Sequence, residues 1–463
     1  MKNRLTNLVL TYAPFWFQNL AISVFGYFWK KRRFGKKFDA EVKKFIDREN
    51  FTSDQWKAYQ TRELRKIVVS AFDNVPFYTE KYTKAGLTRL DLMNITLDTI
   101  SKIPPLEKEE LRNFGKSTLL SNKLDKSGRF YSSSGSTGKP VSIFLSKKSH
   151  QFWTAGYEAR VKNWAGVSKA MRRGMIGGRR ILPKADSSGP YYRWNYFEKM
   201  VYFSAYHISA KTAADYVSGI RKYKLDFMMG YAMSNYLLAN FIIQENLEVP
   251  KLKAVITSSE KLTDEMRSVY KKAYGCETYD TWSGVEAVAQ ISECEKHTLH
   301  ESPDIGIIEV LDENGNQVLP GEMGEAYCTS LYNFDQPLIR YRCGDQLRVS
   351  NKDCECGRSL RTFEEISGRI EDIIEGKDGR KMVRFHGVFI DLEDVIEAQV
   401  IQFSLEEIEI KVVSSKEILS EKSIATMINR MQSQLGDIKV IINQVDGIPR
   451  GPNGKFKAVI SKL

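Results

Sequence analysis

Short apolar runs alternate with helical patterns between residues 171 and 282. The runs have the length of buried strands and lie at Met171–Gly178, Phe227–Tyr231, Leu252–Glu260 and Glu277–Trp282. Helical rhythms separate them at Ala210–Tyr223, Ser234–Asn246 and Thr263–Gly275, the last with a capping threonine and a terminal glycine. This alternation predicts an α/β fold with a parallel sheet covered by helices on both faces. Ligands of such sheets bind at the carboxyl ends of the strands.

The pattern changes after Ile305, where alternating residues and turns such as Glu313–Asn316 predict a β-rich, antiparallel subdomain. After Gly368 a small α+β unit is expected. Its predicted elements are a hairpin at 372–386, a helix at 392–400, a strand at 405–413, a helix at 421–435 and a strand at 438–445. We therefore predict an N-terminal segment at 1–37, a large domain at 38–370 and a small C-terminal domain at 371–463.

The N-terminal segment is apolar and then basic. Residues 5–29 carry no charge and eight aromatic side chains, and the sequence KKRRFGKK follows at 30–37. Pro14, Gln18 and Asn19 interrupt the apolar run, which disfavours a membrane-spanning helix. Packing against the domain and peripheral contact of residues 5–37 with a membrane both stay open. Residues 38–101 are expected to be helical, with a break at 77–86.

Composition narrows the choice of partner and compartment. The 463 residues carry a net charge of +12, which suits anionic ligands, but the sequence contains no recognised nucleic-acid-binding motif. Nucleic acid is therefore disfavoured as a partner. Six cysteines in a chain of this length do not form a disulfide framework, so we expect a reducing, cytoplasmic location, with association to the inner face of the membrane left open.

The segment YSSSGSTGKP at Tyr131–Pro140 combines small residues, hydroxyls and a cation. Small residues let backbone N–H groups approach an anion, hydroxyls add donors, and a lysine supplies counter-charge. The segment therefore predicts a polyphosphate-binding loop, although a flexible linker has a similar composition. Its candidate ligand residues are Ser132, Ser133, Ser134, Gly135, Ser136, Thr137, Gly138 and Lys139.

Further motifs follow this loop in a fixed order. They are TSSE at Thr257–Glu260, YDTWSGVE at Tyr279–Glu286, YRCGD at Tyr341–Asp345, ISGRIED at Ile366–Asp372 and PNGK at Pro452–Lys455. Together they resemble the signatures of the adenylate-forming ligases over about seven-tenths of the chain. Within that superfamily the chain most resembles the phenylacetate–CoA ligase group and its CapK-like branch of capsular polysaccharide biosynthesis proteins, whose aromatic N-terminus is also similar.

The resemblance implies an AMP-forming ligase with ATP as a substrate and Mg²⁺ as a cofactor. It implies that Trp282 stacks on adenine, Asp345 binds the ribose, Glu286 binds Mg²⁺ and Lys455 bridges the carboxylate and the α-phosphate. The catalytic set is then Lys455, Glu286 and Arg369, and the ATP-binding set is the loop residues with Glu260, Trp282 and Asp345. Glu371 matches the hinge at which a small, mobile C-terminal domain pivots.

Two positions depart from the pattern. Val285 stands directly before the Mg²⁺ glutamate, where the superfamily usually has a hydroxyl that donates to the α-phosphate. Cys343 stands where threonine is common, which is a milder change. The loss of a donor at Val285 keeps a catalytically weak relative in consideration.

A second candidate site contains sulfur ligands. Cys294, His300 and the pair Cys354 and Cys356 would supply three thiolates and one imidazole to a tetrahedral structural Zn²⁺. The phenylacetate–CoA ligase branch has cysteine and histidine at corresponding places. His297 is a rival ligand, and reduced structural cysteines are the alternative.

These features lead to one main function and two alternatives. In the first, a carboxylate is activated as acyl-AMP and passed to an amine or thiol acceptor in surface polysaccharide synthesis. An acyl-CoA ligase for an aryl acid of the phenylacetate type is the second. The third is a non-catalytic nucleotide-binding subunit of a polysaccharide assembly, which Val285 and the apolar N-terminus motivate.

Overall fold

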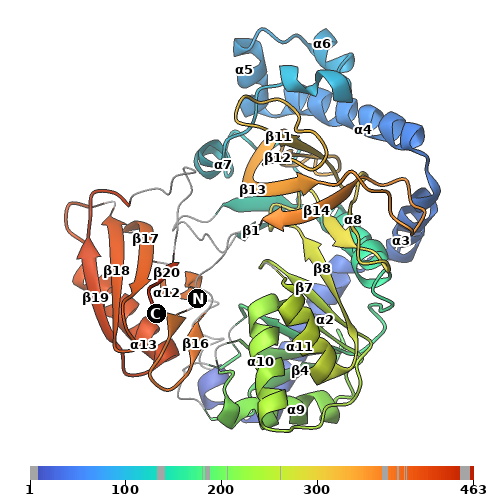
Figure 1. The fold of residues 1–463 in the computed structure, drawn as a ribbon. Helices are drawn as coiled ribbons and strands as arrows, with labels where there is room; N and C mark the ends of the chain where they lie inside the picture. Colours follow the sequence, from blue (N-terminus) through green and yellow to red (C-terminus); the bar gives the residue numbers. More distant parts are fainter. Residues whose placement is uncertain are drawn as a thin grey trace.

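A large mixed sheet runs through most of the chain (Figure 1). The computed structural model describes residues 9–132, 141–179, 181–182, 188–205, 207–260, 262–367, 374–382, 385–389, 392, 394–414, 416–448 and 459–463. Within these residues the strand order is β11-β12-β13-β14-β10-β9-β8-β7-β6-β3-β5-β4. The bounds are β3 Arg173–Gly177, β4 Tyr192–Asn195, β5 Met200–Ser204, β6 Phe227–Tyr231, β7 Ala254–Ser258, β8 Glu277–Trp282, β9 Ile291–Glu293, β10 Leu299–Glu301, β11 Gly306–Leu311, β12 Met323–Ser330, β13 Tyr341–Val349 and β14 Thr362–Ser367.

One half of this sheet is parallel, as predicted. Strands β5, β3, β6, β7 and β8 are parallel neighbours, and successive residues point to opposite faces. Met228 and Val255 pack under the helices α9 (Ala210–Lys222), α10 (Ala232–Gln244) and α11 (Asp264–Tyr274). Phe227 and Ala254 pack on the other face, beside the π-helical segment η3 (Tyr157–Lys162) that follows α8 (Lys147–Gly156). Both faces are therefore covered.

The predicted caps of α11 are confirmed. The Thr263 hydroxyl accepts a hydrogen bond from the Met266 N–H at 3.3 Å, and Gly275 ends the helix at φ +67°. These two residues satisfy backbone groups that a helix end leaves unpaired and supply its left-handed terminus. The helix consequently begins and ends where the sequence pattern places it.

The other half of the sheet is antiparallel. Strands β8 to β14 pair antiparallel, and their apolar faces share a core with the helices between residues 53 and 114. A separate hairpin of β1 (Arg129–Ser132) and β2 (Ser142–Leu145) lies next to this half. The helices are α2 Phe15–Arg33, α3 Phe38–Asp47, η1 Arg48–Asn50, α4 Ser53–Asn74, α5 Pro76–Lys84, α6 Arg89–Met93, η2 Leu97–Lys102 and α7 Lys108–Phe114.

The expected break at 77–86 lies instead at Val75. Pro76 occupies the first position of α5, where its missing N–H costs nothing, so the chain re-enters a helix at once. The aromatic residues Phe77, Tyr78 and Tyr82 are buried on α5, within the stretch where the sequence pattern predicts the break.

The C-terminal elements form a sheet of their own, in the order β19-β18-β17-β20 (Figure 1). A hairpin of β15 (Ile374–Glu375) and β16 (Lys381–Met382) confirms the predicted hairpin, and α13 (Glu421–Leu435) confirms the predicted helix. The remaining elements are α12 His386–Phe389, β17 Val395–Gln402, β18 Glu407–Ser414, β19 Lys439–Gln444 and β20 Val459–Ser461. Glu371 lies outside the described residues, so the boundary stays a prediction.

The predicted helix at 392–400 is wrong, because this stretch becomes the strand β17. A bulge between Val395 and Glu397 adds one residue to the strand. Val395 and Ala398 are therefore three apart in sequence, yet they face partners in β18 that are two apart, and both are buried in one core. A spacing of three between buried residues is also typical of a helix, which explains the wrong prediction.

Candidate active site

Two of the predicted motifs meet at the carboxyl ends of β7 and β8. The strands are parallel and pair Ser258 with Thr281, so the TSSE and YDTW segments leave the sheet side by side. Ser259 has φ +73° and turns the chain after β7, which leaves Glu260 half-buried at this edge. The predicted location of both motifs at one edge of the sheet is therefore confirmed.

The strand β13 brings a third motif to the same place. The indole N–H of Trp282 donates to Asp345 Oδ2 at 3.3 Å. The hydroxyl of Tyr341 donates to Glu286 Oε1 at 3.3 Å. Residues about 60 positions apart in the sequence, Trp282 with Asp345 and Glu286 with Tyr341, are thus joined by direct contacts. The structure brings three of the predicted site residues into one group.

Tyr341 is a residue of this group that the sequence reasoning did not single out. Its side chain is buried, and burial raises the pKa of its hydroxyl well above the usual value, so it remains a donor at physiological pH. Its hydrogen bond fixes the direction of the Glu286 carboxylate. Its position at the start of the YRCGD motif is the sequence feature that points to Tyr341 as a site residue.

Asp280 lies beneath the same edge and was also missed. Its Oδ1 accepts from the Thr257 hydroxyl and from the Thr281 N–H, both at 3.0 Å, and so ties the end of β7 to β8. Burial, together with the charge of Glu293, raises the pKa of Asp280 to about 7. The half-buried carboxyl therefore connects the two motifs through its hydrogen bonds.

The hairpin β1–β2 holds the ends of the predicted phosphate loop. Ser132 pairs with Ser142, and Tyr131 pairs with Ile143, so the two ends of the intervening segment are adjacent. The predicted ligand residues Ser133 to Lys139 lie outside the described residues. The same is true of Arg369, Glu371 and Lys455, and their predicted roles stay untested.

The two departures from the motif pattern have different surroundings. Val285 is 40% exposed at the candidate site and offers no hydrogen-bond donor there. Cys343 forms a hydrogen bond with Cys328, which raises the pKa of the Cys343 thiol well above its usual value. Cys343 therefore remains a neutral thiol beside Asp345 and Glu286.

The cysteine and histidine ligands also come together. The ligand atoms of Cys294, His300, Cys354 and Cys356 all lie within 4.8 Å of one another. The sulfurs of Cys294 and Cys354 are 3.6 Å apart, and the Cys356 sulfur is 3.5 Å from His300 Nε2. A tetrahedral Zn²⁺ with Zn–S near 2.3 Å requires ligands separated by roughly 3.5–3.8 Å. These residues consequently fit zinc.

The surroundings of this cluster favour His300 over His297 as the ligand. His300 Nδ1 lies 3.4 Å from the Leu360 carbonyl oxygen, which leaves Nε2 to face the sulfurs. Burial lowers the pKa of His300 to about 4, so its imidazole is neutral. His297 lies outside the cluster and stacks on Tyr279 with ring centroids 5.0 Å apart.

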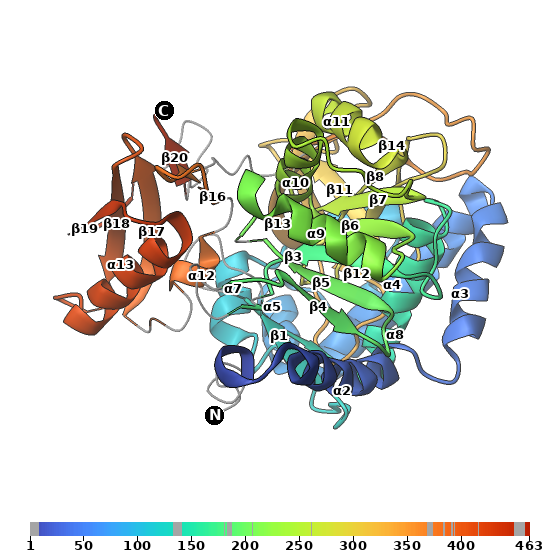
Figure 2. The ribbon, with the colours of Figure 1, turned by 90° about the horizontal axis from the view of Figure 1, so that it is seen from below.

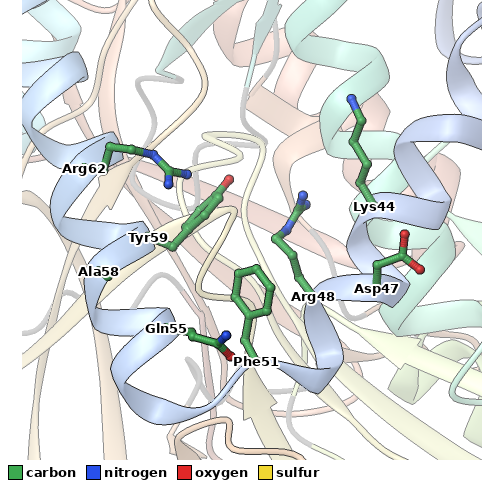
Figure 3. A pocket seen from close by; sticks show the side chains of 8 residues that line it. All are labelled: Lys44, Asp47, Arg48, Phe51, Gln55, Ala58, Tyr59 and Arg62. Carbon is green, nitrogen blue, oxygen red and sulfur yellow. The ribbon is translucent and has the colours of Figure 1, made fainter.

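A surface cavity of about 500 Å³ lies between α3 and α4 (Figure 3), and its Phe51 and Tyr59 pack against the core that contains Cys294. It is lined by Lys44, Asp47, Arg48, Phe51, Gln55, Ala58, Tyr59 and Arg62. Arg48 points from η1 toward the ring of Tyr59 and also pairs with Asp304 at 2.8 Å. None of the predicted site residues that the structure describes lines this cavity.

Comparisons with known proteins agree with the motifs. Residues 374–462 match the family described as the CapK C-terminal domain. The chain is 26% identical over 470 residues to protein CapK of Staphylococcus aureus, which covers 99% of both chains. It is 25% identical over 333 residues to the phenylacetate-coenzyme A ligase of Pseudomonas putida, which covers 70% of this chain and 73% of that one.

The fold is also similar to that of a solved ligase. A structure of 2-hydroxyisobutyryl-CoA ligase with 2-HIB-AMP and CoA superposes with a TM-score of 0.59 at 19% identity, covering 90% of this chain and 91% of the other. The two proteins therefore share a fold.

Proposed function

We propose that this chain, which belongs to the adenylate-forming family of CapK and phenylacetate-coenzyme A ligase, is an ATP-dependent ligase that releases AMP. The observation that carries the proposal is the meeting of Trp282, Asp345 and Glu286 at the carboxyl edge of the parallel strands. A binding site for a nucleoside triphosphate requires an aromatic ring, an acceptor for sugar hydroxyls and a carboxylate for a cation.

The proposed reaction has two steps. A carboxylate oxygen of the acid attacks the α-phosphorus of ATP, the bond to the β-phosphate oxygen breaks, and pyrophosphate leaves. The lone pair of an amine or thiol then attacks the acyl carbon, AMP leaves with its phosphate oxygen, and the nucleophile loses its proton.

The described residues support specific roles in nucleotide binding. The indole N–H of Trp282 holds Asp345 by one oxygen, so the ring and the carboxylate are fixed relative to each other and present a stacking face and an acceptor for ribose. Tyr341 holds Glu286, and a Mg²⁺ bound there would neutralise phosphate charge. Glu260 lies at the same edge and completes the proposed set.

The remaining roles rest on motif positions. We place the β- and γ-phosphates at the loop that starts at Ser132, because its hairpin shares a core with Tyr341 and Trp282. Arg369 and Glu371 are proposed as the nucleotide-holding arginine and the hinge. Lys455 is proposed to bridge the carboxylate and the α-phosphate.

ATP–pyrophosphate exchange over a panel of carboxylic acids tests the first step. The wild type is expected to exchange with at least one acid. Lys455→Ala should lower the exchange by orders of magnitude, since one cation in a water-excluded site can contribute several kcal/mol. ATP binding without exchange for any acid would instead support a non-catalytic nucleotide-binding subunit.

For the acceptor we propose an amine compound in surface polysaccharide synthesis, since similarity to CapK spans the whole chain. The alternative is CoA, which the similarity to phenylacetate-coenzyme A ligase supports over a shorter stretch. Supplying the active acid with CoA or with amino sugars, and measuring AMP release, separates the two. A reducing compartment suits the six free cysteines, and we propose the cytoplasm.

We also propose that Cys294, His300, Cys354 and Cys356 hold a structural Zn²⁺. Four protein ligands leave no open position, so the metal would hold the segments around β9, β10 and residues 354–360 together without taking part in the reaction. Elemental analysis after mild purification should find about one zinc per chain, and Cys354→Ser with Cys356→Ser should lose it. Zinc-free wild-type protein would contradict this assignment.

A further inference from the structure

The helix α2 packs against the protein through polar side chains and through Phe15, Ile22 and Trp29. It lies along β4, the edge strand of the large sheet (Figure 2). Asn19 Oδ1 accepts from the Trp194 N–H at 2.9 Å, and the Ser23 hydroxyl accepts from the Tyr196 N–H at 3.0 Å. These side chains satisfy backbone groups that an edge strand leaves unpaired.

Two more contacts fix this orientation. Gln18 Oε1 accepts from Arg193 Nε at 2.6 Å and is buried. A Cβ at Gly26 would lie 2.1 Å from Asn195 Oδ1, so the close approach of helix and strand depends on glycine. The polar stripe of α2 is therefore its inner face.

The apolar stripe of α2 faces outward as a consequence. Its aromatic and aliphatic side chains are exposed, with Trp16 at 66% and Phe28 at 65%. The turn after β4 extends the stripe, because the rings of Tyr27 and Phe197 are 5.1 Å apart. We call this surface the aromatic face; it consists of Trp16, Phe17, Leu20, Val24, Phe25, Tyr27, Phe28, Tyr196 and Phe197. A contiguous exposed apolar surface of this kind marks an interaction site.

Exposed cations border the aromatic face. Lys30, Lys31, Lys36 and Lys37 are exposed at and beyond the end of α2, and Lys31 Nζ lies 4.4 Å from the centre of the Tyr27 ring. The chain has no acidic residue before Asp39. A second copy of this surface would offer these lysines no opposite charge from the same segment, whereas an anionic surface would.

We propose that the aromatic face lies in the headgroup region of an anionic lipid bilayer, with α2 parallel to the membrane plane. Tryptophan, tyrosine and phenylalanine with flanking lysines are the residues that interfacial helices use. The inner face of α2 stays bound to β4, so the helix lies on the membrane while the sheet remains outside it. Among the described residues, no helix is both long and apolar enough to cross a bilayer.

Sedimentation of the full chain with lipid vesicles tests this proposal. Vesicles of phosphatidylcholine with about 30 mol % phosphatidylglycerol should bind the protein, pure phosphatidylcholine should bind it weakly, and high salt should weaken binding. The double variant Trp16→Ser, Phe28→Ser should bind at least about tenfold more weakly, since two rings lose their burial in lipid. Lys30→Gln with Lys31→Gln should reduce binding to the anionic vesicles alone.

A matched control removes equally exposed apolar side chains elsewhere. Leu319 is 68% exposed and Ile418 is 79% exposed, and both lie outside the aromatic face. Leu319→Ser with Ile418→Ser should leave vesicle binding unchanged. Circular dichroism melting should show that both double variants are folded, and exchange activity without lipid is measured separately, so failure of the ligase proposal would not affect this test.

Two results would overturn the proposal. One is the absence of binding to anionic vesicles, or binding that Trp16→Ser, Phe28→Ser leaves intact. The other is a wild-type dimer in analytical ultracentrifugation that the same variant dissociates while no vesicle binding is seen, which would assign the aromatic face to a second copy of the chain.

Discussion

Half-buried Asp280 has two opposing effects on the protein. Its hydrogen bonds with Thr257 and Thr281 connect two motifs of the candidate site. Burial next to Glu293 disfavours its charged form and raises its pKa to about 7, against 3.8 for the ordinary side chain. The native state therefore binds more protons than the unfolded state between about pH 4 and pH 7, so this residue makes the protein less stable as the pH rises through that range.

Asp280→Asn removes this titration while keeping an acceptor oxygen. The free energy of unfolding of the variant relative to wild type should rise by about 2–3 kcal/mol between pH 5 and pH 8. Urea denaturation of both proteins at the two pH values measures this difference and cancels the titration of other groups. An equal difference at both pH values would mean that Asp280 has an ordinary pKa.

A substitution at Val285 is expected to increase ATP–pyrophosphate exchange instead of lowering it. Val285→Thr adds a hydroxyl of similar shape directly before Glu286, at an exposed position where the fold should not change. One new hydrogen bond to a charged phosphate contributes about 1.5–3 kcal/mol, so exchange should rise by about tenfold or more. Val285→Ala is the control without a hydroxyl. Equal exchange in the two variants would mean that another residue already makes this contact.

At the scale of elements, strands β3 and β6 approach each other closely at Gly230. The residue has φ +130°, and a Cβ there would lie 1.8 Å from the Ile176 carbonyl oxygen. This conformation and this distance both require glycine. Gly230 pairs with Ile176 and with Thr257, so it sets the spacing of the strands that lead to the candidate site.

Gly230→Ala should therefore destabilise the protein by about 2–4 kcal/mol, through backbone strain and displacement of β6. Gly315→Ala is the matched control, because Gly315 also has a positive φ, of +82°, but a Cβ there would meet nothing within 4 Å. Gly315→Ala should lower the free energy of unfolding by about 1 kcal/mol. Thermal melting of both variants compares the two costs, and equal losses would show that the contact with Ile176 relaxes freely.

Local chemistry explains which elements the sequence could predict. The helix at Thr263–Gly275 carries its own cap residues, and the strand at Phe227–Tyr231 is a short apolar run, so both were correctly predicted. The sequence pattern wrongly predicts a helix at 392–400, because a bulge changes the spacing of the buried residues in the strand Val395–Gln402. The bulge depends on pairing with a distant strand, which a local pattern does not contain.

The candidate site also contains residues that the sequence predicts and residues that it does not. The motifs predict Trp282, Glu286 and Asp345, and the structure adds two hydrogen bonds, one from the Trp282 indole N–H to Asp345 and one from Tyr341 to Glu286. The motifs do not predict the role of Asp280, because that role depends on its hydrogen bonds to Thr257 of β7 and Thr281 of β8. The sequence shows that the N-terminus is apolar. It does not show that the polar residues of this segment face inward, because their partners at and after β4 are about 170 positions away.

At the scale of the whole molecule, α2 links the aromatic face to the candidate site. Its last turn places Arg32 against the hairpin β1–β2, where Nε donates to Tyr131 Oη at 2.6 Å. The same guanidinium donates to the carbonyl oxygens of Ser127 and Leu145 at 2.8 and 2.7 Å. The helix that meets the proposed lipid surface thus also supports the strands that lead into the phosphate loop.

The C-terminal elements have a core separate from that of the large sheet. The buried residues of this core lie between Ile374 and Val459, and its sheet shares no described strand with the larger one. Loss of these elements removes none of the described contacts among Trp282, Asp345, Glu286 and Tyr341. The larger part of the chain should therefore fold without them.

A chain that ends at Ser367 tests this division together with the proposed role of Lys455. The shortened chain should unfold cooperatively. Its tryptophan fluorescence should be quenched when ATP is added, because the proposed nucleotide-binding residues at the edge of the sheet are all present. It should not catalyse ATP–pyrophosphate exchange, because the cation proposed to bring carboxylate and α-phosphate together is missing. Full-length Lys455→Ala should show the same loss with both cores present. Exchange retained by the shorter chain would place the catalytic cation within the first 367 residues.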